Sequence, residues 1–96
     1  MLIIPHSILE TIPPQQDTTQ DPMVYAKMDT DIGWEYYVLS YYKPNKLFHV
    51  YALPDHEKMR LSYDDLVKIE LQYGTEVEFD YDFIPQPLQE VIDANR

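Results

Sequence analysis

An unbroken alternation of acidic and apolar residues from Glu76 to Phe83 is the feature that most limits how this chain can fold. A period of two is typical of a β-strand with one buried face, because successive side chains of a strand point to opposite sides. We therefore predict a strand whose carboxylates stand about 6.6 Å apart on its outer face. The outward set, the acidic row, is Glu76, Glu78, Asp80 and Asp82, and the inward set is Val77, Phe79, Tyr81 and Phe83.

Residues 34–42 predict a second strand, because aromatic and β-branched side chains crowd it and helix-forming residues are few. Strict alternation assigns Trp34, Tyr36, Val38 and Tyr42 to one face and Tyr37, Leu39 and Tyr41 to the other. Both faces are then mostly apolar, which indicates a central strand. We expect Tyr37 and Tyr41 to lie outside the core, since Glu35 shares their face.

The remaining segments predict an α+β protein with an antiparallel sheet of four to five strands and two to three short helices. Ser62 is the predicted N-cap of one helix and Gly74 its C-cap, and Pro87 opens the last helix. All of residues 1–96 are expected to form a single compact domain. The other predicted elements are a short helix from Ser7 and strands at Met23–Met28 and Leu47–Leu53; one more short strand at Glu57–Leu61 is left open.

The charge balance restricts the partners that the protein can have. Seventeen acidic residues against seven basic ones give a formal net charge of −10. Such a charge disfavours binding to nucleic acid or to an anionic membrane, and it favours basic protein surfaces and cations. The absence of cysteine excludes disulfides and zinc–thiolate sites, so a reducing cytoplasm is the expected location. The opening Met-Leu-Ile-Ile run is too short for a signal peptide, and no stretch approaches the roughly 20 apolar residues of a membrane span.

No pattern in the sequence predicts catalysis or a cofactor, so we expect a protein that is not an enzyme. Two glycines cannot form a glycine-rich phosphate loop, and no cysteine is present as a nucleophile. His6, His49 and His56 are scattered without metal-ligand spacing. Asp80 and Asp82 would attract a hard cation, yet alternate strand residues stand too far apart to chelate one ion without another segment.

Four short motifs follow one another along the chain. They are Asp21-Pro22, Trp34-Glu35-Tyr36-Tyr37, Ser62-Tyr63-Asp64-Asp65-Leu66 and the tail from Phe83 through Pro85, Pro87 and Leu88 to Val91. In this order they resemble a family of small proteins encoded on plasmids, phages and other mobile elements and catalogued only as a domain of unknown function. The resemblance spans about Pro13 to Ile92. It implies a mobile-element gene in conflict with host defence, and it supplies no catalytic residue.

The acidic row has two main interpretations. It is either the solvated face of an edge strand, where charge discourages aggregation, or a rigid ladder of charges that occupies a basic groove built for nucleic acid. We predict a non-catalytic acidic module that inhibits a nucleic-acid-binding host defence protein of the anti-CRISPR or anti-restriction type; a metal- or small-ligand-binding protein or enzyme is the alternative. No direct binding to nucleic acid or membrane is expected, and a homodimer is left open. The predicted partner-binding residues are Glu76, Glu78, Asp80, Asp82, Glu35, Tyr37 and Tyr41.

Overall fold

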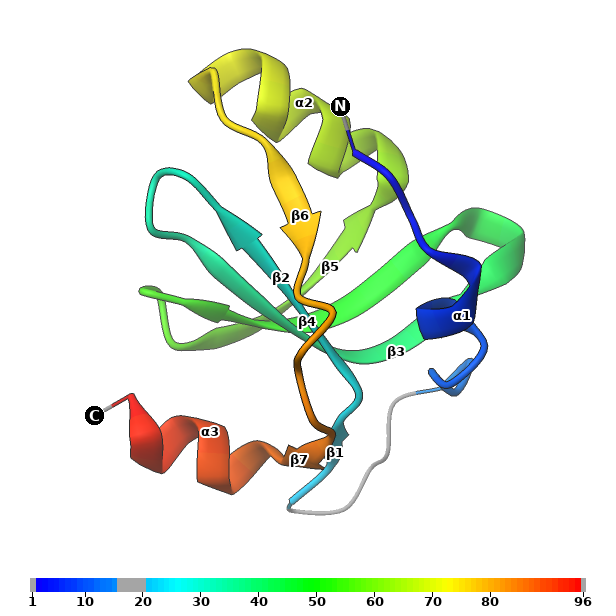
Figure 1. The fold of residues 1–96 in the computed structure, drawn as a ribbon, viewed down its shortest axis with the longest axis vertical. Coiled ribbons are helices and arrows are strands. Elements are labelled where there is room, and N and C mark those ends of the chain that lie inside the picture. Colours follow the sequence, from blue (N-terminus) through cyan, green and yellow to red (C-terminus); the bar gives the residue numbers. More distant parts are fainter. Residues whose placement is uncertain (1, 16–20, 96) are drawn as a thin grey trace.

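Helices cover both faces of a five-stranded antiparallel sheet in the computed structural model, which describes residues 2–15 and 21–95 (Figure 1). The strand order is β5-β4-β3-β2-β6, and a separate two-stranded sheet pairs β1 with β7. The Cα radius of gyration is 12.5 Å, the value expected for a compact domain of this length. The strands are β1 (Met23–Val24), β2 (Ala26–Thr30), β3 (Glu35–Tyr42), β4 (Leu47–Leu53), β5 (Glu57–Ser62), β6 (Val77–Phe79) and β7 (Gln86–Pro87). The helices are α1 (His6–Leu9), α2 (Tyr63–Tyr73) and α3 (Leu88–Ala94), with a 3-10 turn, η1 (Lys43–Asn45). These elements confirm the predicted α+β class.

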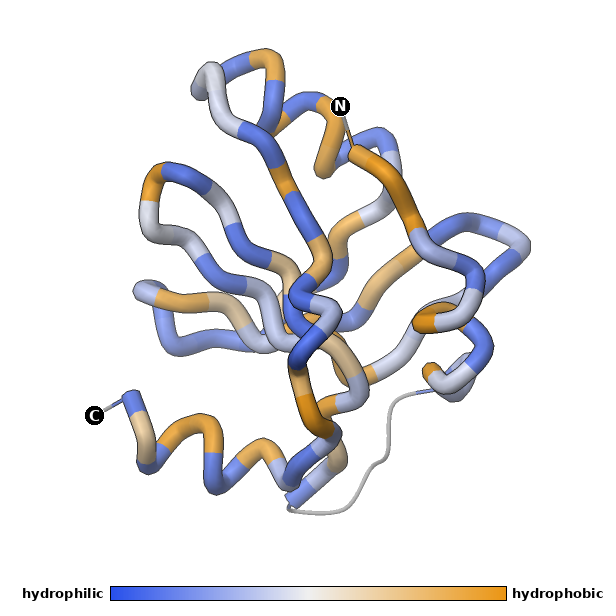
Figure 2. The backbone as a smooth tube through the Cα atoms, in the orientation of Figure 1, coloured by the Kyte–Doolittle hydropathy of each residue, from blue (hydrophilic) through white to orange (hydrophobic). Residues whose placement is uncertain are grey.

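One face of the sheet packs against α2, α1 and the strongly hydrophobic N-terminal segment (Figures 1 and 2). Alternate residues of each strand point to this side, because the side chains of a strand have a period of two. We call this cluster the α2-side core; its fully buried members include Met28, Val38, Phe48, Val50 and Leu66.

The opposite face of the sheet packs against α3. Leu88 and Val91 of the helix lie against Tyr37, Leu39 and other strand residues in a cluster that we call the α3-side core. The strand β3 therefore has apolar contacts on both sides and lies in the middle of the sheet, which confirms the predicted central strand. The prediction that Tyr37 lies outside is wrong: α3 covers that face, and only 6% of Tyr37 is exposed.

A β-bulge in β3 changes which side chains share a face. Val38 pairs with Val50 and Ser40 pairs with His49, so Leu39 is the extra residue. A bulge inserts one residue and reverses the alternation beyond it. Tyr41 consequently lies in the α2-side core, with its ring centroid 4.5 Å from that of Phe48, and is buried. The expectation that Tyr41 is exposed is therefore also wrong.

The helix α2 begins and ends at the predicted residues. The Ser62 hydroxyl accepts a hydrogen bond from the Asp65 N–H at 3.1 Å, and the Asp65 carboxylate accepts one from the Ser62 N–H at 2.9 Å. This capping box satisfies two backbone donors that the helix itself cannot. Gly74 ends the helix with φ of 63°, a left-handed conformation that glycine adopts without strain.

None of the helices in the described ranges is long and apolar enough to cross a lipid bilayer.

The acidic segment forms a shorter strand than its alternation predicts. The strand β6 ends at Phe79, and the Asp80 carboxylate then accepts a hydrogen bond from the Asp82 N–H at 2.9 Å. Aspartate side chains favour such local turns over a strand ladder. Val77 and Phe79 are buried as predicted, but Tyr81 is 69% exposed. The predicted strand over Glu76–Phe83 is therefore wrong beyond Phe79.

Candidate functional site

Carboxylates from three adjacent strands form one line across the sheet. Asp29 of β2 pairs with Glu35 of β3 on one side and with Glu78 of β6 on the other. Side chains at directly paired positions point to the same face of a sheet. This face is the one that α3 covers farther along, since Lys27 and Tyr37, which are also paired, lie beside these residues.

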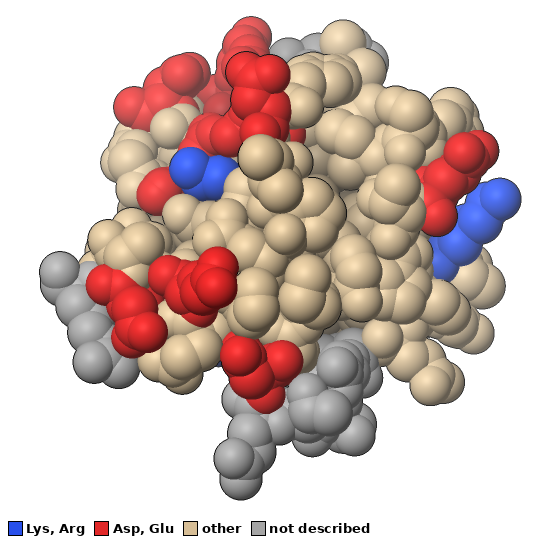
Figure 3. Space-filling model, turned by 60° about the horizontal axis from the view of Figure 1, so that its bottom comes forward, with Lys and Arg blue, Asp and Glu red and all other residues tan. Residues whose placement is uncertain are grey.

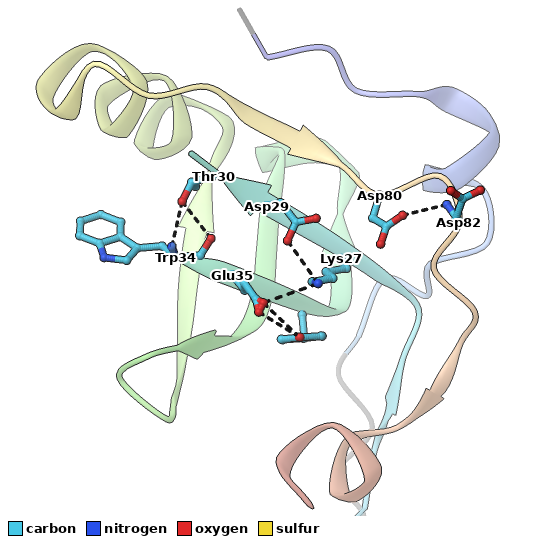
Figure 4. A network of polar contacts seen from close by, with 8 residues as sticks. Lys27, Asp29, Thr30, Trp34, Glu35, Asp80 and Asp82 are labelled. Atoms are coloured by element: carbon cyan, nitrogen blue, oxygen red, sulfur yellow. Dashed lines mark hydrogen bonds and ion pairs between the residues drawn. The ribbon is translucent and has the colours of Figure 1, made fainter. Parts of the chain in front are cut away.

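The turn between β2 and β3 sets this register. The Thr30 hydroxyl accepts a hydrogen bond from the Trp34 N–H and donates one to the Trp34 carbonyl, both at 2.9 Å (Figure 4). Gly33 has φ of 86°, a conformation that side-chain-bearing residues rarely adopt. Because the turn fixes which residues oppose each other, it places Asp29 directly across from Glu35.

Further carboxylates extend this line into a two-dimensional surface. Glu76 precedes β6, and its N–H donates to the Asp31 carboxylate at 3.4 Å. Asp80 follows β6, and its N–H donates to the Lys27 carbonyl at 2.9 Å. Acidic side chains accordingly gather around a basic one at the upper left of Figure 3. We call this surface the acidic patch; its members are Asp29, Asp31, Glu35, Glu76, Glu78 and Asp80.

Lys27 lies between two members of the patch. Its ammonium nitrogen is 3.3 Å from Asp29 Oδ1 and 3.5 Å from Glu35 Oε2, and 5.5 Å from the centre of the Tyr37 ring (Figure 4). The Tyr37 hydroxyl also donates to Glu35 at 3.4 Å. Burial by itself lowers the pKa of Lys27, but Tyr37, Asp29 and Glu35 together outweigh it and raise this pKa. Lys27 therefore stays charged and holds Asp29 and Glu35 in place.

The excess of negative charge lies on the β6 side of the patch. A hydrogen bond between the side chains of Glu76 and Glu78, followed by the charge of Glu76, raises the pKa of Glu78; Asp31 adds to the effect. Glu76 and Glu78 are both exposed to solvent. Two carboxylates held together in this way repel each other when both are ionised, and an incoming cationic group would relieve that repulsion.

The structure brings together four of the seven residues predicted to bind a partner. Glu35, Glu76, Glu78 and Asp80 are in the acidic patch, whereas Asp82 is exposed in the turn that follows it. Tyr37 lies beneath the patch, where it contacts Lys27 and packs edge-on against Phe83. Tyr41 lies in the α2-side core, on the opposite face of the sheet.

Sequence reasoning missed Asp29, Asp31 and Lys27, which only strand pairing brings beside β6. It also missed the exposed apolar side chains that follow Asp80 in the chain. Tyr81 is 69% exposed and Ile84 is 76% exposed, both just after Asp80 in the chain. The one available signal was the Asp-x-Asp pair at residues 80–82, because aspartates at this spacing favour a turn.

Within residues 2–15 and 21–95, no group of three or more histidine or carboxylate side chains is arranged as the metal-binding alternative would require.

The chain matches no protein-family model, and comparison with curated proteins and with solved structures finds no similar one. The resemblance to a mobile-element family therefore stays a prediction.

Proposed function

We propose that this protein is a non-catalytic binding module of a mobile element, which acts in the cytoplasm by docking its acidic patch on the basic nucleic-acid site of a host defence protein. The observation that carries the proposal is the line of Glu78, Asp29 and Glu35 across three hydrogen-bonded strands. A sheet holds such charges at fixed spacings, so little conformational entropy is lost on binding. A site that neutralises the regularly spaced phosphates of nucleic acid presents lysines and arginines that such a surface complements.

The overall charge supports rapid association with a basic partner. The chain has a formal net charge of −10, and the acidic patch gathers six carboxylates around one lysine, Lys27. Complementary potentials steer two proteins together and raise the association rate, chiefly at low ionic strength. An anti-CRISPR or anti-restriction protein that competes with nucleic acid would benefit from this rate, because it must occupy the site first.

Exposed apolar side chains beside the patch supply candidate anchors. Tyr37 and Tyr41 are buried and cannot reach a partner in this conformation. Tyr81 and Ile84 have the exposure that the function requires. Tyrosine is common at the centres of protein interfaces, because its rigid ring buries a large area and keeps a hydroxyl for hydrogen bonding. We therefore assign to Tyr81 the anchoring role that the sequence suggested for Tyr37 and Tyr41.

Affinity capture from a host lysate tests the proposal. The bait is the intact protein, and the comparison is the double variant Glu76→Gln/Glu78→Gln, which removes two exposed charges. The matched control is Glu57→Gln/Asp64→Asn, which removes two exposed charges from β5 and α2. We expect a nucleic-acid-binding protein that wild type and control retain, that the patch variant loses, and that duplex DNA or RNA displaces.

Salt provides a second readout, since a charge-led complex weakens steeply as ionic strength rises. Equal capture by the patch variant, or a partner that nucleic acid does not displace, would overturn the proposal.

A further inference from the structure

A cavity of about 490 Å³ opens between α1 and the end of the β3–β4 hairpin. In Figure 1 α1 and the β3–β4 turn, which border the cavity, lie on the right, whereas the β2–β3 turn, next to the acidic patch, lies on the left. Cavities of about 300–1,000 Å³ are typical of small-molecule sites. This cavity is therefore large enough for a ligand and is separate from the patch.

The walls of the cavity are mostly apolar and come from two parts of the chain. Leu9 and Ile12 belong to α1 and the segment after it, and Tyr41 and Pro44 belong to β3 and η1. The Tyr41 N–H donates to the Pro13 carbonyl at 2.9 Å, which ties the two walls together. This backbone hydrogen bond fixes the two walls of the cavity relative to each other.

The rim of the cavity is positive on a strongly negative protein. Lys43 and Lys46, two of the seven basic residues, lie on it with His6, and Glu10 is the acidic residue among the lining side chains. Two lysines against one glutamate give the lining a formal net charge of +1, with histidine counted as neutral by convention.

We propose that this cavity binds a small amphipathic monocarboxylate, with an aromatic or medium-chain apolar body between α1 and η1 and its carboxylate between Lys43 and Lys46. The apolar walls bind the apolar body of the ligand, because removing apolar surface from water drives such binding. The two lysine ammonium groups attract the single carboxylate of the ligand. The cavity is partly open to solvent, and its volume of about 490 Å³ suits a small molecule better than a protein partner, which requires a broad surface of about 800 Å² on each side.

The test is a titration of ¹⁵N-labelled protein with 2-naphthoate, followed by NMR and calorimetry. We expect saturable binding of one ligand per chain, with the amide shifts concentrated at Leu9, Ile12, Lys43 and Lys46. The neutral analogue 2-naphthamide should bind more weakly. Lys43→Gln/Lys46→Gln should weaken naphthoate binding about five- to tenfold, as the loss of two exposed charge contacts predicts.

Lys58→Gln/Lys68→Gln is the matched control, because it removes two exposed charges from β5 and α2, outside the cavity. This control should bind naphthoate as wild type does, and the spectra show directly whether each variant is folded. Glu76→Gln/Glu78→Gln should also bind normally, so failure of this inference is distinguishable from failure of the proposed function.

Any of four results would overturn the inference. The first three are no saturable binding, equal affinity for naphthoate in the Lys43→Gln/Lys46→Gln variant, and amide shifts that map to another surface. The fourth is that a second copy of the chain closes the cavity. In that case the cavity amides would shift with protein concentration alone, and sedimentation would show a dimer.

Discussion

At the scale of single residues, Ser40 is unusual because it is a polar residue buried in the sheet. Its side chain is fully buried beside the β3 bulge, and among the described residues its hydroxyl has no hydrogen-bond partner. A buried hydroxyl without a partner costs about 1–3 kcal/mol. We expect Ser40→Ala to raise the free energy of unfolding by about 1 kcal/mol and the melting temperature by about 4–8 °C. Thermal unfolding followed by circular dichroism measures this, and a lower melting temperature would contradict it.

Unlike the Ser40 hydroxyl, the Glu70 carboxylate has hydrogen-bond partners, and it joins three separate segments of the chain. It accepts hydrogen bonds from the backbone N–H groups of Leu2 at 3.1 Å and Val77 at 3.0 Å. Glu70→Ala should lower the free energy of unfolding by about 1–3 kcal/mol, since both donors lose their acceptor. Gln72→Ala, an exposed position on the same helix, is the control and should change stability by less than about 0.5 kcal/mol. Urea denaturation distinguishes the two variants; similar midpoints would show that the hydrogen bonds of Glu70 add nothing to the stability of the fold.

At the scale of elements, the sequence predicted strands and helices well wherever the backbone is regular. The bounds of β4 match the prediction, and both ends of α2 lie at the predicted caps. The predicted strand Met23–Met28 is instead two strands in different sheets, β1 and β2. The other errors occur at two local departures, the extra residue Leu39 in β3 and the turn that begins at Asp80. Each reverses or ends an alternation that continues in the sequence. Hydrophobic period cannot reveal them, because they depend on hydrogen bonds in the folded chain.

The candidate site was less predictable than the fold for a related reason. Alternation placed Glu76 and Glu78 on an outer face, which needs only the sequence of one strand. Asp29 and Glu35 join them only through the pairing of β2 with both neighbours. Strand order and register depend on the whole core, so the site is a property of the sheet and not of a motif.

The short length of β6 leads to a prediction about two aromatic residues. Phe79 is buried against Phe48, with ring centroids 6.2 Å apart, whereas Tyr81 is 69% exposed. Phe79→Ala should lower the free energy of unfolding by about 3–5 kcal/mol, through lost burial and a cavity. Tyr81→Ala should change it by less than about 0.5 kcal/mol. Chemical denaturation of both variants checks this; equal losses would indicate that the strand continues to Phe83.

At the scale of the whole molecule, repulsion within the acidic surface makes stability depend on pH. The pKa of Glu78 is raised in the folded protein, by its hydrogen bond with Glu76 and by the charge of Glu76. A carboxyl group with a raised pKa favours folding when protonated, and this contribution is lost as the pH rises through the raised pKa.

We therefore expect Glu78→Gln to gain stability relative to wild type as the pH rises from the acidic range to neutrality. Melting temperatures of both proteins across this range provide the measurement. Glu57→Gln is the control, because Glu57 lies on β5 at the far edge of the sheet. If the melting temperature of the wild-type protein instead rose relative to that of the Glu78→Gln variant with increasing pH, Glu76 and Glu78 would not interact as described.

The burial of β3 on both faces determines how the two cores depend on each other. The α2-side core and the α3-side core lie on opposite sides of the sheet, and alternate residues of β3 belong to each. Release of either helical layer leaves one face of this strand against water, which weakens the hydrogen bonds that hold the other layer. We therefore expect unfolding to be a single cooperative event, in which the amides of β3 exchange with solvent only when the whole domain opens.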